Sequence, residues 1–206
     1  TVYPLTYIPD SIRYYTNGTL VAAPAVGTAA PLTITGISVP AGGNATIIYE
    51  TTTNEFTPRG SEDSVTNTVT VTGAGLANAV TATESVSPVA APDLAITKSV
   101  SPSVVAENGQ ITYTFLIENY GNTEASAGDN VIITDTFNPI LTGITVTYNG
   151  NAWTAPDSYT YNEATGEFAT VAGQITVPAA TFTQNTATGV ITTTPGTATV
   201  TVTGTI

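Results

Sequence analysis

TPGTATVTVTGTI (194–206) shows the pattern that decides the fold class of this chain. Apolar Val200 and Val202 alternate with threonines, which predicts a β-strand with one buried face and one polar face. The related stretch PAGGNATIIYETT (40–52) is followed by a further strand-like run, SVTNTVTVTG (64–73), and residues 194–206 have no such successor. We therefore expect an open edge, which a strand from elsewhere would complete, along Thr199, Val200, Thr201, Val202 and Thr203.

The composition favours strands and argues against several classes of function. Of the 206 residues 41% are hydrophobic and only 9% are charged, and the formal net charge is −12. Such an acidic chain repels phosphate groups, so we expect no nucleic acid partner; without a long apolar run we expect no membrane insertion. The chain has no His and no Cys, which removes imidazole catalysis, thiol nucleophiles and most zinc sites. We predict a protein that is not an enzyme and has no cofactor or metal site.

The two halves of the chain resemble each other. IRYYTNG (12–18) matches ITVTYNG (144–150), and ITGISVPAG (34–42) matches VAGQITVPA (171–179). Both Asn-Gly pairs supply the positive φ angles of tight hairpin turns. SVSPVAAPD (85–93) has the Pro-rich composition of a short linker. We therefore predict two domains, at residues 1–91 and 92–206, with a further hairpin at residues 181–194.

The spacing of the matched stretches indicates that each half lacks strands. Ile144 lies 52 residues after residue 92, whereas its counterpart Ile12 lies 11 residues after the start. The first half is therefore short by about 40 residues, enough for two or three strands and their turns. The second half has those strands and lacks the final one. Neither half is expected to be a self-sufficient β-sandwich, which needs about seven strands.

Residues 92–141 resemble the conserved repeat called domain of unknown function eleven, which occurs in tandem on bacterial surface proteins. The pattern of that family reads roughly L-x-I/V-x-K, a Gly-containing turn, Y-T-I/V-x-V-x-N-x-G and V-T-D-T-L/F-P. The matching residues are Leu94, Ile96, Lys98, Gly109, Tyr113, Thr114, Phe115, Asn119, Gly121, Thr134, Asp135, Thr136 and Pro139. SVTNTVTVTG resembles the closing strand of the family, T-N-T-A-x-V-T.

The resemblance implies two tandem immunoglobulin-like β-sandwiches, exported to the cell surface and without known catalysis. Longer relatives of the two-repeat type usually carry an upstream T-N-x-A-x-L-T-Y segment, which resembles the strand that the second half lacks. We therefore expect strands from a partner, or from segments outside this sequence, to complete the domains.

The missing strands predict a structural subunit of a bacterial extracellular filament, assembled head to tail from copies of itself by donor-strand complementation. The alternative is a fragment of a tandem-repeat adhesin or cell-wall or S-layer protein that binds surface glycans or host proteins. Both interpretations place the protein outside the cell, on its surface or on an appendage.

Lys98 is the single lysine of the chain and lies early in the first strand of the second domain. Some Gram-positive surface domains carry at this place the lysine of a Lys–Asn isopeptide cross-link, which also needs a carboxyl group to move protons. Asp135 and Glu118 are the candidate carboxyl groups, and the Asn would come from the donated strand. The alternative is an exposed lysine on an edge strand.

Trp153, Tyr159 and Tyr161 are close in sequence and are a candidate aromatic platform for stacking a sugar ring. The alternative is that the single Trp packs at the rim of the core beside a hairpin.

Overall fold

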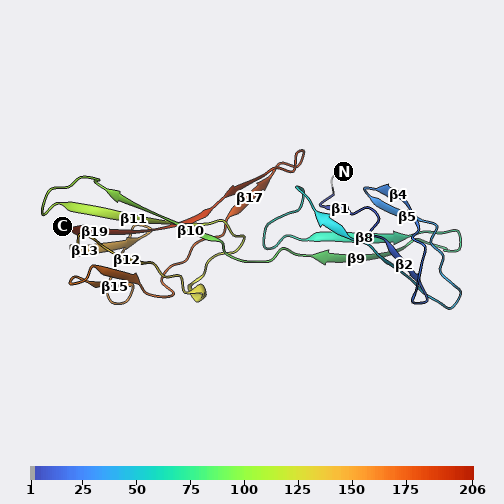
Figure 1. Ribbon diagram of the computed structural model, residues 1–206, viewed down its shortest axis with the longest axis horizontal. Helices are drawn as coiled ribbons and strands as arrows, with labels where there is room; N and C mark the ends of the chain where they lie inside the picture. Colours follow the sequence, from blue (N-terminus) through green and yellow to red (C-terminus); the bar gives the residue numbers. More distant parts are fainter. Residues whose placement is uncertain (1–2) are drawn as a thin grey trace. The chain divides into compact units, whose positions relative to one another are not determined.

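The computed structural model describes residues 3–206, and nearly all of its regular structure is β-strand (Figure 1). A single turn of 3-10 helix, η1 (Ala127–Asp129), is the only helical element in the described part of the chain. The all-β prediction is confirmed. Its physical basis is the abundance of Thr, Val, Ile and Tyr, whose branched or aromatic side chains fit a pleated surface better than a helix.

The described chain forms two compact units. The first contains the residues up to Pro88 together with Thr183–Thr192, and the second contains Val89–Phe182 with Thr193–Ile206. This division lies a few residues before the predicted boundary at 91. The predicted hairpin is present as β17 (Thr181–Gln184) and β18 (Ile191–Thr194). The sequence did not predict that its turn belongs to the first unit, where the Gln184 side-chain amide donates a hydrogen bond to the Glu55 carbonyl (2.8 Å).

The second unit contains a five-stranded and a three-stranded antiparallel sheet, in the orders β10-β11-β19-β13-β14 and β12-β16-β15. The larger sheet consists of β10 (Leu94–Ser101), β11 (Gln110–Asn119), β19 (Gly196–Thr205), β13 (Thr142–Tyr148) and β14 (Asn151–Trp153). The smaller sheet consists of β12 (Thr134–Thr136), β16 (Glu167–Thr170) and β15 (Tyr159–Asn162).

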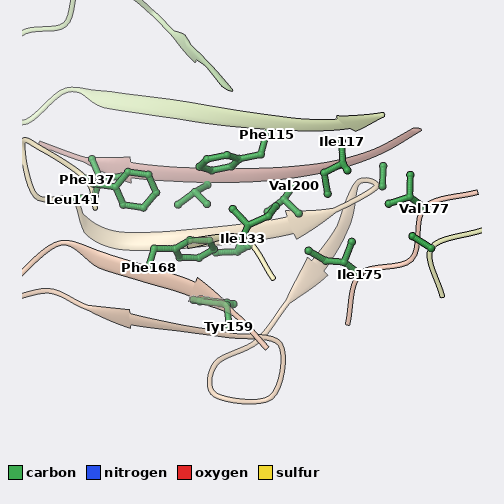
Figure 2. Close-up of a cluster of buried hydrophobic side chains, with 14 of the residues drawn as sticks. Phe115, Ile117, Ile133, Phe137, Leu141, Tyr159, Phe168, Ile175, Val177 and Val200 are labelled. Carbon is green, nitrogen blue, oxygen red and sulfur yellow. The ribbon is translucent and has the colours of Figure 1, made fainter. Parts of the chain in front are cut away.

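The hydrophobic core of the second unit lies between these two sheets. Figure 2 shows Phe115 and Val200 of the larger sheet facing Phe168 of the smaller one. The rings of Phe115 and Phe168 lie parallel, with centroids 6.5 Å apart. Val200 and Val202 are completely buried, so the apolar face that the sequence predicted for this strand is the core-facing one.

The open edge predicted at Thr199, Val200, Thr201, Val202 and Thr203 is wrong. Strand β19 lies in the middle of its sheet, because Val202 pairs with Tyr113 of β11 on one side and with Val146 of β13 on the other. Its polar face carries a threonine ladder, in which Thr201 bonds Thr147 (2.6 Å) and Thr203 bonds Thr112 (2.8 Å). Alternation shows that one face of a strand is buried, but it does not show which strands are its neighbours.

The first unit is made of small sheets with little core. Their orders are β1-β7, β3-β2-β6, β4-β5 and β8-β9. The strands are β1 (Leu5–Tyr7), β2 (Arg13–Thr16), β3 (Thr19–Val21), β4 (Ala25–Ala29), β5 (Leu32–Thr35), β6 (Ala45–Ile48), β7 (Thr51–Thr53), β8 (Val65–Val71) and β9 (Val80–Val86). Among residues 3–88, the only buried hydrophobic side chains are Ile12 and Tyr14.

The predicted internal repeat has a structural counterpart in the two units. Strands β3-β2-β6 repeat the arrangement of β14-β13-β19, and each Asn-Gly pair forms a two-residue hairpin turn with positive φ. In the first unit the Asn17 side chain accepts a hydrogen bond from the Asn44 N–H (2.9 Å). In the second the Asn149 side chain accepts the same bond from the Thr199 N–H (2.8 Å). Asn44 directly precedes β6, and Thr199 belongs to β19. Because the two Asn side chains bind the backbone of these two strands in the same way, β6 is the counterpart of β19.

The repeated I-S/T-V-P stretch shows how the units differ. Ile175 and Val177 are completely buried in the second unit, whereas Ile37 and Val39 of the first unit are 42% and 62% exposed. Val177 lies beside the end of β11, whose Asn119 side chain donates to its carbonyl (3.3 Å). Among the described residues the first unit has no counterpart of β11 to cover this stretch.

Candidate functional site: the open flank of the second unit

Two edge strands of the second unit, one from each of its sheets, face each other. Strand β10 pairs only with β11, and β12 pairs only with β16, within the described residues. An ion pair between Lys98 of β10 and Asp135 of β12 joins the two edges. We call this side the open flank and define it by Leu94, Ile96, Lys98 and Val100 of β10 and by Thr134, Asp135 and Thr136 of β12.

The inward face of β10 is apolar but only half covered. Leu94, Ile96 and Val100 lie opposite Asn119, Ile117 and Tyr113 of β11, on the core-facing side of the sheet. They are nevertheless 39%, 55% and 43% exposed, whereas Ile117 is 3% exposed. Large apolar side chains on the core-facing side of a sheet are normally covered, so the exposure of this row distinguishes β10 from the other strands of the larger sheet.

The free edge of β12 offers backbone groups for strand pairing. Ile133 accepts a hydrogen bond from the Thr170 N–H, and Phe137 donates one to the Gly166 carbonyl, both toward β16. In an antiparallel pair, alternate residues direct their backbone groups to opposite sides of the strand. The N–H and C=O groups of Thr134 and Thr136 therefore point away from β16, toward the open flank.

Lys98 and Asp135 meet among aromatic rings. The Lys98 Nζ lies 4.6 Å from the ring centroid of Tyr113, 5.6 Å from that of Phe115 and 5.5 Å from that of Phe137. Asp135 Oδ1 accepts a hydrogen bond from the Thr136 N–H (2.9 Å). Its Oδ2 is buried and meets the Lys98 ammonium, and the described residues offer it no further donor. The side chains of Lys98 and Asp135 are 40% and 18% exposed.

The structure thus brings together Lys98 and Asp135, which the sequence proposed as parts of one site, and removes Glu118 from that site. Lys98 lies opposite Phe115, whereas Glu118 lies opposite Ala95, on the other face of the sheet. Glu118 instead approaches Tyr120, and the nearby carboxylate, which also accepts a hydrogen bond from the phenol, raises the pKa of Tyr120 above its usual 10.0.

The predicted aromatic platform of Trp153, Tyr159 and Tyr161 does not form. Trp153 stacks on Tyr148 in the five-stranded sheet, with centroids 4.9 Å apart. Tyr159 is buried in the core. The Tyr161 hydroxyl is held by the backbone of Leu141, donating to its carbonyl (2.8 Å) and accepting from its N–H (3.0 Å). Trp153 is separated from the two tyrosines because it lies on β14 of the five-stranded sheet, whereas Tyr159 and Tyr161 both lie on β15 of the three-stranded sheet.

The sequence also missed the exposed apolar row of β10. Its alternation in LAITKSVS (94–101) was visible and predicted a strand. A row that is half covered cannot be distinguished from a buried one by the pattern alone, since both read as alternating apolar residues.

Comparison of the chain with protein-family models, with curated proteins and with solved structures gives no match. Within residues 3–206 there is no helix of the length and apolarity that crossing a membrane requires. The same residues contain no group of three or more acidic, His or Cys side chains arranged to hold a metal ion.

Proposed function

We propose that this protein is a structural subunit of an extracellular filament, in which a strand from a second copy occupies the open flank of the second unit. The observation that carries the proposal is the uncovered apolar row of β10 beside the unpaired edge of β12. Addition of a strand would satisfy the outward backbone groups of β12 and cover Leu94, Ile96 and Val100, and each net hydrogen bond contributes about 1 kcal/mol.

The strand order supports an immunoglobulin-like interpretation of the second unit. In that fold, strands A, B, E and D form one sheet and strands C, F and G form the other. The order β10-β11-β19-β13 fits A-B-E-D, and β12 then takes the place of strand C. The neighbour that strand C needs is strand F, which follows strand E in the chain. The open flank is the place of that strand.

The first unit indicates the kind of strand that would fit. Its β6 is the counterpart of β19 and therefore of strand E. The short β7, which pairs with β1, comes next, and we assign β8, the next long strand, to the place of strand F. Strand β8 presents Val65, Val69 and Val71 on one face, and Val69 and Val71 are each 52% exposed. A strand of this type from a second copy supplies the alternating apolar side chains that would cover the row on β10. Because donor and acceptor surfaces differ, the contact is head to tail and extends into a filament.

We also propose that the protein acts outside the cell and that its partner is a second copy of itself. The chain resembles repeats of bacterial surface proteins, and its net charge of −12 and lack of Cys and Met suit an exposed polymer without disulfides or readily oxidised side chains. The partner is the same protein, and no catalytic role is proposed.

A pair of charge substitutions on one strand tests the proposal in the full-length protein. Ile96→Glu places a carboxylate in the apolar row, whereas Thr97→Glu places it on the opposite face of β10. We expect electron microscopy to show filaments for the wild type and for Thr97→Glu, and size-exclusion chromatography to show monomers for Ile96→Glu. Ile96 is 55% exposed in the unassembled chain, so both variants should keep the wild-type circular dichroism spectrum.

Filaments of normal length from the Ile96→Glu variant would contradict the proposal. So would a structure of the native protein in which a segment of the same copy fills the open flank. The latter result would favour the alternative, a module of a longer surface array.

A further inference from the structure

The outer face of the three-stranded sheet contains a hollow of about 590 Å³, and every residue that lines it belongs to β12, β15 or β16. Asp135, Phe168 and Tyr161 lie opposite one another and form the core-facing row of this sheet. Successive side chains of a strand point to opposite faces, so the residues on either side of this row point away from the core. The hollow therefore lies on the face of the smaller sheet that is turned away from the hydrophobic core.

The hollow is centred on a small side chain. Ala169 of β16 lies between Thr134 of β12 and Thr160 of β15, and its methyl group is too short to fill the space between them. The hydroxyls of these two threonines make no hydrogen bond to any described residue. On the outer face of the larger sheet, by contrast, the hydroxyls of Thr147 and Thr201 bond each other (2.6 Å). The two hydroxyls beside Ala169 are therefore available to a ligand.

The next row of the hollow contains Glu167 with Asn162 directly opposite it on β15. Glu167 Oε2 accepts a hydrogen bond from the Thr165 hydroxyl (2.9 Å), and Asn162 Oδ1 accepts one from the Ala164 N–H (2.9 Å). These bonds hold both side chains and leave Glu167 Oε1 as an acceptor and Asn162 Nδ2 as a donor without a partner in the described part of the chain. Groups that are already held in place lose little conformational entropy when a ligand binds.

The lining indicates the chemical class of the ligand. Its outward residues are three threonines, one Asn, one Glu and one Ala, so it offers no apolar surface for a hydrophobic ligand. The single outward carboxylate repels anions and supplies too few oxygen atoms to hold Ca²⁺. A neutral sugar fits this set of groups, because each sugar hydroxyl can both donate to the carboxylate and accept from the amide.

We propose that the hollow binds one pyranose ring of a neutral glycan. About 5 Å separates the Cβ atoms of directly opposite residues on neighbouring strands. Glu167 and Asn162 can therefore reach adjacent hydroxyls of one ring, which lies over Ala169. The proposal goes beyond filament assembly and does not depend on it, since a strand added to β12 pairs with the backbone of that strand and leaves its outward side chains free.

Saturation-transfer difference NMR on the 206-residue protein tests the proposal, because it observes the sugar and works for monomers and assemblies alike. The probes are the methyl glycosides of glucose, mannose and galactose. We expect at least one of them to bind with a Kd on the order of 1 mM, since a ligand of about 13 non-hydrogen atoms gains little without an aromatic ring to stack on. The methyl glycoside of glucuronic acid should give no signal, because its carboxylate meets Glu167.

Variants locate the site on the sheet. Ala169→Leu fills the hollow and should abolish binding. Glu167→Gln keeps the shape and removes the charged acceptor, which should weaken binding about tenfold. Thr160→Val should weaken it about fivefold, and its matched control is Thr145→Val, at an exposed position on the outer face of the larger sheet, which should bind like the wild type. Circular dichroism should show the wild-type spectrum for all four variants.

Three results would overturn the proposal. The first is the absence of signal from all three neutral glycosides at about 50 mM, where a site with a Kd of about 1 mM is almost full. The second is binding that neither Ala169→Leu nor Glu167→Gln weakens. The third is equal binding of the glucuronic acid glycoside. Ile96→Glu, which should prevent assembly, should leave sugar binding unchanged, so the failure of either proposal can be recognised by itself.

Discussion

The side chain of Asn119 ties together three segments of the second unit. It is completely buried, and its Oδ1 accepts hydrogen bonds from the N–H groups of Asp93 (3.0 Å) and Gly121 (2.9 Å). Its Nδ2 donates to the carbonyls of Thr123 (2.8 Å) and Pro178 (3.0 Å). The residue belongs to the N-x-G pattern seen in the sequence, but only the folded chain shows that it fixes the start of β10 and the loop after β16.

Asn119→Ala should therefore lower the free energy of unfolding of the second unit by about 3–5 kcal/mol, since it leaves several buried backbone groups without partners. Urea unfolding followed by circular dichroism measures the change. Asn151→Ala, at an exposed position of β14, is the control and should stay within about 0.5 kcal/mol of the wild type. Equal free energies of unfolding for the two variants would show that the hydrogen bonds of Asn119 do not stabilise the second unit.

Hairpins are the elements that the sequence predicted best. The Asn-Gly pairs at 17–18 and 149–150 both form the expected turns, with φ of 48° at each Asn and near 80° at each Gly. A two-residue turn of this type needs positive φ at both positions, and Asn and Gly tolerate it most readily. The signal is local, so it can be read without knowledge of the rest of the fold.

The turn at Asn149 allows backbone conformation to be separated from hydrogen bonding. Asn149→Gly keeps the positive φ and loses the bond to the Thr199 N–H, which should cost about 1 kcal/mol. Asn149→Ala loses the same bond and adds the left-handed penalty of about 1–2 kcal/mol. The difference in urea midpoint between the two variants measures the cost of placing an alanine at positive φ. Equal midpoints would show that the turn changes conformation to avoid this cost.

Strand partners were predicted less well than strands. The alternation in residues 198–206 correctly predicted a strand with buried valines, but the expected free edge proved to be the centre of the larger sheet. The edges that form the open flank, β10 and β12, belong to strands whose sequences do not distinguish them from central strands. Inward and outward side chains alternate in the same way on central and edge strands, and pairing depends on backbone groups that all residues share.

At the scale of the whole molecule, the two units differ in how much core they contain. The second unit has a continuous cluster of buried side chains between its sheets, whereas in residues 3–88 only Ile12 and Tyr14 are buried hydrophobic side chains. Strands without a covering layer expose their apolar faces, as Ile37 and Val39 of the first unit do.

This difference predicts how the two parts of the chain behave when it is divided after Pro88. Residues 89–206 should unfold in one cooperative thermal transition, because burial of a contiguous core makes unfolding all-or-none. Residues 1–88 should show no such transition in differential scanning calorimetry, since they bury too few apolar side chains to offset the entropy of ordering the chain. A cooperative transition in residues 1–88 alone would contradict this account.

The sequence by itself determined the fold class, the alternating faces of the strands, the repeated hairpins and the approximate division into two parts, because each depends on the period or conformation of neighbouring residues. Only the tertiary structure decided that β19 is central, that the open flank lies between β10 and β12, and that Lys98 meets Asp135. It also decided that Glu118 lies on the other face of its sheet and that Trp153 lies in a different sheet from Tyr159 and Tyr161. These features depend on which distant strands pair, and the backbone hydrogen bonds that decide the pairing are the same for every residue type except proline.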